Sequence, residues 1–479
     1  MNETSTISPL QHPGFRFSYR SLLIPLLLGI FIRLILLIMA DTVTPVGDEN
    51  IYIRVGGFIK KKWMYFGPWP PGYPFTIAFF LKLFGAEGLF ILKLFQVLCS
   101  GVIGYSIIRM SHLIFGDKGA RFSGYGWALY LPIAFFTHRL WPETLLMVLF
   151  IPAMYLFLNY YLTNADLPFR GLVLSGAGVL YRCSLYFKEV SFYLFFFLVG
   201  VLFLKKPRNW RRTILFPLTV IAVLSPLTIR NFHTYGEFVP VGATFGINVR
   251  EGLNAQYQNY DYKHIPHLIK EVHQDHNGNW DFVYHTFIDY GPGWKASPKR
   301  KGKRIVPLLK RGKLDAKKAI EYALNHKTAF VLTRIKRIAD FITPLSFLVR
   351  DLSPRFYSGI LASDFIRRVL IPISMISVMA LISIAWINLI HLRWNRHAFI
   401  FFVILFSYFI LTSFLISMSR FRLPTVPFLL VLLGGLAIRD SNKNKTLSTW
   451  IIIISGLVVL LSLWILNLPE IVEVVAFSW

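Results

Sequence analysis

Long apolar segments recur along most of the chain, and they constrain its fold more than any other feature. The first covers residues 22–40. A helix needs about 20 mostly apolar residues to cross the hydrocarbon core of a bilayer. Only 16% of the 479 residues are charged, whereas a soluble domain carries about 25%. The sequence therefore predicts an all-α polytopic membrane protein.

We expect about eleven transmembrane helices, within a range of ten to thirteen. The expected spans cover approximately residues 22–40, 87–110, 122–136, 142–161, 169–183, 189–204, 213–229, 368–390, 397–417, 423–438 and 449–467. Their edges stay open between 160 and 205 and between 325 and 367. No A-x-A-like cleavage site follows the first span, so we expect it to be retained.

Basic residues in the short loops predict the orientation, because Lys and Arg accumulate on the cytoplasmic side. The basic loops are 205–212, 391–397 and 439–445. With eleven spans and a cytoplasmic N-terminus, all three lie in the cytoplasm. Residues 41–86, 231–367 and 419–422 then lie on the opposite side. In the first of these segments, 51–62 and 73–84 predict short helices at the interface, joined by a Pro/Gly turn.

The net charge of +27 favours contact with anionic lipid headgroups and phosphorylated lipids, and we expect no nucleic-acid partner. Residues 295–318 carry eleven Lys/Arg against one Asp. They form either a solvated loop or a patch for an anionic lipid surface or acidic acceptor. Cys99 and Cys183 both lie in apolar stretches, so no disulfide framework is expected.

An acidic pair, Asp48-Glu49, follows the first span closely. Carboxylates beside a bilayer are costly unless they are paired or perform chemistry. Asp48 is the strongest candidate for a catalytic base. It could instead only cap a helix that starts near Asn50. Glu49 could share the catalytic task, bind a metal or extend the same cap.

Glu143 opens the fourth span on the same side, within Trp141-Pro142-Glu143-Thr144. It is either a carboxylate favoured at a helix start or, with nearby His138, a second site acid or metal ligand. No HExxH or CxxC spacing occurs, so the sequence indicates no metal and metal dependence stays open.

Arginines at the outer ends of spans are candidates for binding a phosphate, because guanidinium groups bind phosphate bidentately. The candidates are Arg420, Arg422, Arg230 and Arg182. The alternative is ordinary snorkelling to lipid headgroups. Arg33 lies deeper, inside the first span, where a charge needs a partner. We favour a structural ion pair between Arg33 and Asp41.

The order of several motifs resembles the C-type glycosyltransferases, and more narrowly the superfamily of protein O-mannosyltransferases and lipid A aminoarabinose transferases. The motifs are Gly47-Asp48-Glu49-Asn50-Ile51-Tyr52, Pro70-Pro71-Gly72-Tyr73-Pro74 with Leu81-Lys82-Leu83-Phe84-Gly85, Trp141-Pro142-Glu143-Thr144-Leu145, Pro226-Leu227-Thr228-Ile229-Arg230-Asn231 with Tyr235-Gly236-Glu237-Phe238-Val239, and Arg420-Phe421-Arg422-Leu423-Pro424. Trp69 departs from the pattern, since many relatives have His or Glu there.

The resemblance implies an integral membrane enzyme that transfers a sugar from a polyprenyl- or dolichyl-phosphate donor to a glycan, lipid or protein acceptor. By analogy, Asp48 is the base of an inverting displacement and the outer arginines bind the lipid phosphate. Residues 1–230 would form the catalytic transmembrane module, 231–367 an acceptor-binding loop region, and 368–479 the last helices. A prokaryotic inner membrane, with the site facing the periplasm, fits best.

Two further classes stay open from the sequence. A transporter or flippase of a lipid-linked saccharide would carry charges near the midplane of broken spans. A non-catalytic component of a glycan-assembly complex would need neither Asp48 nor the arginines at 420 and 422. The clearest charges cluster at the outer interface, which favours an enzyme.

Overall fold

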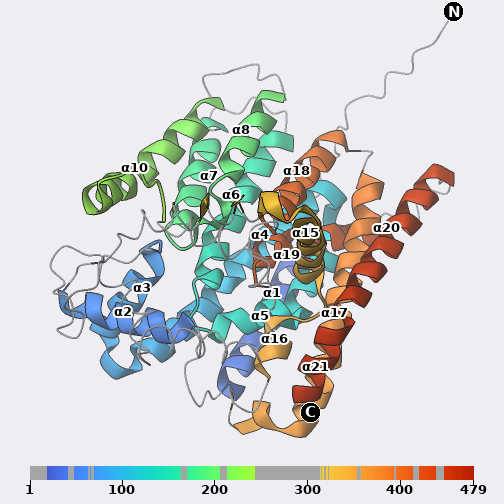
Figure 1. The fold of residues 1–479 in the computed structure, drawn as a ribbon, viewed down its shortest axis with the longest axis horizontal. Coiled ribbons are helices and arrows are strands. Elements are labelled where there is room, and N and C mark those ends of the chain that lie inside the picture. Colours follow the sequence, from blue (N-terminus) through green and yellow to red (C-terminus); the bar gives the residue numbers. More distant parts are fainter. Residues whose placement is uncertain are drawn as a thin grey trace, which may run out of the picture.

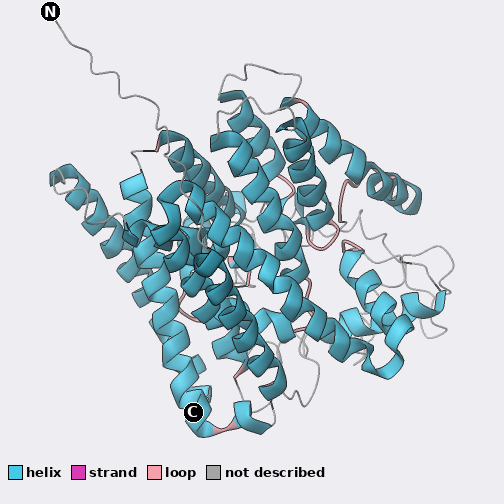
Figure 2. Ribbon diagram, turned by 180° about the vertical axis from the view of Figure 1, so that it is seen from behind, coloured by secondary structure: helices cyan, strands magenta, loops and turns pink. Residues whose placement is uncertain are grey.

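The computed structural model describes most of the chain outside the segment that follows the seventh expected span. The described residues are 19–40, 48–62, 65, 69–162, 170–204, 213–242, 326–352, 357, 359–392, 395–413, 420–437 and 447–478, with short stretches between 313 and 325. All regular structure in these ranges is helical (Figure 1), and no strand occurs among them (Figure 2). The prediction of an all-α polytopic membrane protein is confirmed.

The N-terminal half forms a series of long helices joined by short ones. Its helices are α1 (Tyr19–Met39), α2 (Asp48–Lys62), α3 (Gly72–Phe84), η1 (Gly85–Glu87), α4 (Gly88–Leu129), α5 (Leu131–Ala134), η2 (Phe135–His138), α6 (Glu143–Leu162), α7 (Arg170–Leu185), η3 (Glu189–Ser191), α8 (Leu194–Leu204) and α10 (Leu215–Tyr235).

The C-terminal half continues with helices that pack against this first group (Figure 1). They are α15 (Lys327–Ile342), α16 (Phe347–Asp351), η6 (Gly359–Ala362), α17 (Asp364–His391), α18 (Arg396–Ser413), η8 (Leu423–Thr425), α19 (Val426–Leu432), η9 (Leu433–Ala437), α20 (Leu447–Leu466) and α21 (Leu468–Ser478).

Seven helices of the described part are long and apolar enough to cross a membrane. Two shorter apolar helical segments, Glu189–Phe203 and Leu423–Ala437, coincide with further expected spans. Every expected span has a helical counterpart, whereas the count of eleven stays a prediction. Large apolar side chains such as Ile38 and Leu27 are exposed along these helices, as is usual where a helix faces lipid.

The stretch labelled α4 contains two helices, which correspond to the two spans expected at 87–110 and 122–136. Its backbone breaks at Gly116, where φ is 71° and ψ is −167°. Glycine tolerates this left-handed region because it has no Cβ. The helical path therefore ends at Gly116 and a second helix begins beyond it. Ser123 Oγ donates to Ser111 Oγ at 2.8 Å, so the second helix folds back along the first.

The charge expected inside the first span packs against α4. Arg33 donates from Nη1 to Gly29 O at 2.9 Å and from Nη2 to Trp127 O at 3.2 Å. Its guanidinium carbon lies 4.0 Å from the centre of the Trp127 ring. These contacts hold the Arg33 guanidinium within the bundle and satisfy part of its hydrogen-bonding capacity. Asp41, its expected partner, lies outside the described residues.

The short helices expected in the 41–86 segment are present as α2 and α3, which pack against each other (Figure 1). The first residue of α3, Gly72, donates its N–H to Tyr186 O at 2.7 Å. A Cβ at this position would approach Tyr186 O to 2.6 Å, so the contact requires glycine. The pair is thereby fixed to the segment that follows α7.

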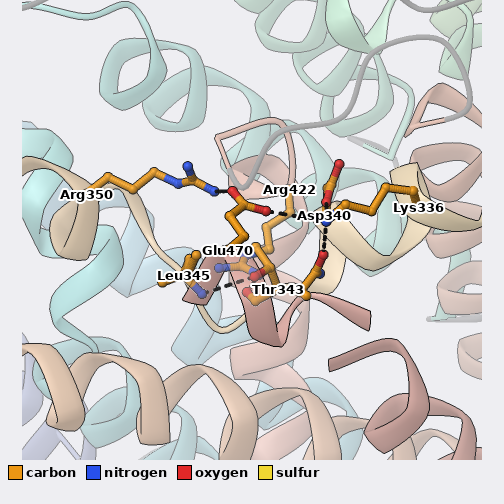
Figure 3. A network of polar contacts seen from close by, with 8 residues as sticks. Lys336, Asp340, Thr343, Leu345, Arg350, Arg422 and Glu470 are labelled. Carbon is orange, nitrogen blue, oxygen red and sulfur yellow. Dashed lines mark hydrogen bonds and ion pairs between the residues drawn. The ribbon is translucent and has the colours of Figure 1, made fainter. Parts of the chain in front are cut away.

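The 231–367 segment is more ordered at its end than the sequence suggested. Helix α15 packs against α18 and α20, and α16 packs against α17 and α21. Figure 3 shows Glu470 of α21 between Arg350 and Lys336, with its carboxylate 2.5 Å from Arg350 Nη2 and 3.4 Å from Lys336 Nζ. The basic residues of 295–318 lie almost wholly outside the described part.

Candidate active site

Several helix ends meet at one end of the bundle, and charged side chains gather there. Asp48 is the first residue of α2, and Glu143 is the first of α6. Lys188 follows the end of α7, and Arg420 lies in the turn before η8. The sequence predicted that three residues of this set, Asp48, Glu143 and Arg420, lie on one side of the membrane. The structure brings them into direct contact.

Arg420 lies at the centre of this charged cluster. Its Nη1 donates to Asp48 Oδ2 at 2.6 Å, and its Nε donates to Glu143 Oε1. Lys188 Nζ donates to the same Glu143 oxygen at 2.7 Å. The guanidinium carbon of Arg420 lies 4.3 Å from the centre of the Trp141 ring. Two carboxylates and two cations therefore balance one another in charge.

Exposure differs sharply between the two carboxylates. The Glu143 side chain is 1% exposed, whereas that of Asp48 is 48% exposed. Burial alone would lower the pKa of Arg420, but Glu143 and Asp48 raise it above its usual range. Burial lowers the pKa of Lys188, although Glu143 opposes this shift. Asp48 is thus the carboxylate of the cluster that a bound molecule can reach.

Glu49 points into a second, buried set of contacts next to the first. Its Oε1 accepts the N–H of Leu140 at 2.7 Å, and its Oε2 lies 3.5 Å from Arg139 Nη1. Arg139 Nη2 in turn donates to Asp351 Oδ2 of α16 at 2.8 Å. Neighbouring residues of the acidic pair therefore have separate partners.

A glutamine on α4 holds the turn that supplies these partners. Gln96 donates from Nε2 to Thr137 O at 3.0 Å and to Arg139 O at 2.8 Å, and it accepts from Tyr73 Oη at 3.0 Å. Gln96 and Tyr73 are fully buried. The turn between η2 and α6 is thus joined to α3 and α4 through satisfied hydrogen bonds.

The other arginine candidates lie apart from the cluster. Arg422 is buried and donates from Nη1 to Phe341 O at 3.2 Å and to Thr343 O, so it caps the end of α15 (Figure 3). Arg230 donates from Nη1 to Asn231 Oδ1 at 2.7 Å and from Nη2 to Tyr65 O.

Arg182 is also buried, and it contacts an aromatic ring instead of the cluster. Its guanidinium carbon lies 5.2 Å from the centre of the Phe192 ring. Within the described residues, its Nε and Nη1 have no hydrogen-bond partner. Its predicted role in binding the donor stays a prediction, as do those of Arg230 and Arg422.

His138 and Glu143 have different partners. His138 Nε2 lies 3.0 Å from Tyr357 Oη. Burial and the nearby Arg139 lower the pKa of His138 well below its usual value, which keeps the ring neutral. Among the described residues, no group of three or more His, Cys, Asp or Glu side chains is placed to hold a metal ion. Metal dependence stays open.

The candidate list from the sequence omitted several residues of the two networks. Lys188 and Arg139 are not among the residues that the sequence predicted for the site. Trp141 belongs to the acidic motif that opens α6, so that motif could have pointed to it. Asp351 and Tyr357 lie where no motif was recognisable, and only the fold brings them to the site.

The fold and the charged cluster define an integral membrane protein with a polar site at one end of its helical bundle. Residues 69–229 match a family model described as dolichyl-phosphate-mannose-protein mannosyltransferase. The matched range includes Glu143, Arg139 and Lys188, whereas Asp48 and Arg420 lie outside it. A search of curated proteins gives no match.

This match confirms the resemblance to the C-type glycosyltransferases and supports a membrane glycosyltransferase of that type. In general terms, the family implies a lipid-linked sugar donor and a glycan or protein acceptor.

Proposed function

We propose that the protein transfers a sugar from a polyprenyl-phosphate donor to an acceptor hydroxyl on the non-cytoplasmic side of a prokaryotic inner membrane. The observation that carries this proposal is the contact of Arg420 with both Asp48 and Glu143 at one end of the bundle. The cluster combines a reachable carboxylate with cations suited to a phosphate. Those are the groups that sugar transfer from a lipid phosphate requires.

Asp48 would act as the general base. Its oxygen takes the proton of the acceptor hydroxyl while the hydroxyl oxygen forms a bond to the anomeric carbon. The bond between that carbon and the phosphate oxygen breaks, and its electron pair stays on the departing polyprenyl phosphate. A single base is sufficient for this inverting displacement, whereas a retaining mechanism needs two facing carboxylates.

Arg420 and Lys188 would stabilise the phosphate. A guanidinium has five N–H donors, and Asp48 and Glu143 occupy two of the Arg420 nitrogens. Charge that develops on the leaving oxygen is stabilised most by donors that are already fixed in place. Glu143 supplies that fixation, because it is buried between the two cations. Arg182 and Arg230, which lie apart from the cluster, would contact other parts of the donor.

The contacts of Arg33 favour an enzyme over a carrier. A transporter of lipid-linked saccharides would use charges near the midplane of its spans. Arg33 instead donates to Gly29 O and Trp127 O and lies over the Trp127 ring. It is therefore engaged by the packing of α1 on α4, while the clustered charges lie at one end.

The proposal is tested by transfer in vitro with the purified protein in detergent or vesicles. Defined polyprenyl-phosphate sugars are offered with glycan, lipid and peptide acceptors, and a chelator is added in parallel. We expect product with the wild type and a fall in kcat of at least about 100-fold for Asp48→Asn. The KM for the donor should change little, because the base contacts the acceptor.

Asp364→Asn is the matched control, since this aspartate is 69% exposed and pairs with Arg367 on α17. It should retain wild-type activity. Full activity of Asp48→Asn would overturn the assignment of the base. Absence of transfer from every polyprenyl-phosphate donor would overturn the proposed function itself.

A further inference from the structure

The two carboxylates of the acidic pair have different environments. The Asp48 side chain is 48% exposed and contacts Arg420, whereas the Glu49 side chain is 3% exposed and contacts the turn at 139–140. Both belong to the first turn of α2. A contact that fixes Glu49 therefore also fixes the backbone from which Asp48 projects.

The partner that fixes Glu49 is itself fixed by a residue far along the chain. Arg139 is fully buried, and its two terminal nitrogens are directed at Glu49 and at Asp351. Asp351 ends α16 and is also fully buried. The Arg139 guanidinium carbon lies 4.9 Å from the Tyr357 ring and 5.0 Å from the Phe135 ring. Both rings pack against the guanidinium and limit its movement.

A buried network of two carboxylates and one guanidinium is a costly way to stabilise a fold. Burial penalises each charge, and well-packed apolar residues often serve stability equally well. Burial raises the pKa of Asp351 to about 6, which agrees with this cost although Arg139 opposes the shift. What the network provides is a defined geometry, because charged hydrogen bonds with fixed directions specify one arrangement.

We propose that Arg139 and Asp351 are positioning residues, which hold Glu49 and thereby aim the neighbouring Asp48 at its place beside Arg420. The large segment between α10 and α17 thus contributes to the geometry of the base through α16. The inference rests on the proposed function for its kinetic consequence, and on the contacts alone for its structural one. Neither residue touches the reacting atoms.

Asp351→Asn tests the inference, because the amide keeps the shape of the side chain and removes the charge that Arg139 contacts. Asp340→Asn is the matched control, since Asp340 lies on α15 and pairs with Lys336 at 2.9 Å. Hydrogen–deuterium exchange is measured over residues 50–56 of α2, and kcat and the donor KM are measured by transfer. Thermal midpoints of the detergent-purified variants monitor folding.

We expect faster exchange at residues 50–56 in Asp351→Asn and not in Asp340→Asn. We also expect kcat per folded molecule to fall about 10- to 100-fold at an unchanged donor KM, because small misplacements of a catalytic group are costly. A lower yield of folded protein with normal kcat would indicate a merely structural role and would overturn the inference.

Exchange at residues 50–56 that equals the wild type, or that rises equally along the whole chain, would also overturn the inference. If the wild type transfers no sugar, the proposed function fails. The exchange comparison still decides whether Asp351 positions the first turn of α2, so the two failures are distinguishable.

Discussion

Arg420 Nη1 lies 2.6 Å from Asp48 Oδ2, although 372 positions separate the two residues in the sequence. Because Arg420 also contacts Glu143, its planar group bridges both carboxylates, which a lysine ammonium reproduces poorly. We expect Arg420→Lys to lower kcat/KM for the donor by about 10- to 100-fold, measured by initial transfer rates. Arg420→Gln should lower kcat/KM for the donor further, because it also removes the positive charge.

Arg170→Lys is the control for this exchange of arginine by lysine. Arg170 begins α7, at the helix end remote from Lys188, and donates to Tyr160 O at 2.9 Å. The Arg170→Lys variant should transfer sugar at the wild-type rate. Equal activity of Arg420→Lys and the wild type at low donor concentration would contradict a bridging role of the guanidinium.

Lys188→Gln is expected to weaken binding of the donor phosphate. The Lys188 ammonium group lies 2.7 Å from Glu143 Oε1 and 4.7 Å from the centre of the Phe421 ring. We expect the donor KM to rise about tenfold, as for the loss of one charged hydrogen bond. Donor titrations measure it, with exposed Lys118→Gln as the control.

Lys188 also predicts a pH dependence. Because burial lowers the pKa of Lys188, the wild-type kcat/KM should fall at a lower alkaline pH than an ordinary lysine would produce. Lys188→Gln should lack this alkaline limb. An unchanged limb in the variant would assign it to another group.

Asp351 predicts a pH dependence of stability. Burial raises its folded-state pKa to about 6 from an ordinary value near 3.8. Between about pH 4 and 6 the folded state thus holds a proton that the unfolded chain releases, so its contribution to the free energy of unfolding decreases as pH rises. The contribution is present in full below about pH 4 and is lost above about pH 6.

Between the two limits, the contribution of Asp351 to the free energy of unfolding changes by on the order of 3 kcal/mol at most. Asp351→Asn cannot titrate, so its thermal midpoint should vary less than that of the wild type across this window. Midpoints are compared at several pH values in one detergent. Parallel curves for the two proteins would contradict the raised pKa of Asp351.

The contact of α1 with α4 predicts a packing effect. A Cβ at Gly29 would lie 2.2 Å from a Trp127 ring carbon, and Trp127 is fully buried. We expect Gly29→Ala to lower the free energy of unfolding by about 1–3 kcal/mol through overpacking. Gly200→Ala in α8 is the control, because nothing lies within 4 Å of its Cβ position.

Gly200→Ala should leave the thermal midpoint unchanged or raise it slightly, since alanine favours helix more than glycine by roughly 1 kcal/mol. Equal midpoints for the two alanine variants would show that α1 can move away from Trp127 without loss.

The sequence predicted the helices well because transmembrane segments are set by local composition. A continuous apolar stretch must form a helix in lipid, whatever its neighbours are. The Pro/Gly turn before Gly72 likewise predicted that α2 and α3 would be separate helices. The break at Gly116 falls in the gap that the sequence predicted between the spans at 87–110 and 122–136.

The candidate site was predicted only as a set of residues on one side of the membrane. Arg420 and Arg422 stand two positions apart and were treated alike, but in a turn this spacing sends them in different directions. One contacts Asp48, and the other caps the end of α15. Lys188 and Asp351 carried no local signal strong enough to be included.

By itself the sequence determined the helical membrane fold and the presence of Asp48, Glu143 and Arg420 at matching span ends, because apolar length and charge placement are local properties. The tertiary structure alone decided which charges pair. It separated Asp48, exposed beside Arg420, from Glu49, buried beside Arg139. Such pairing depends on how distant helices approach one another, and burial then makes the partner of each charge decisive.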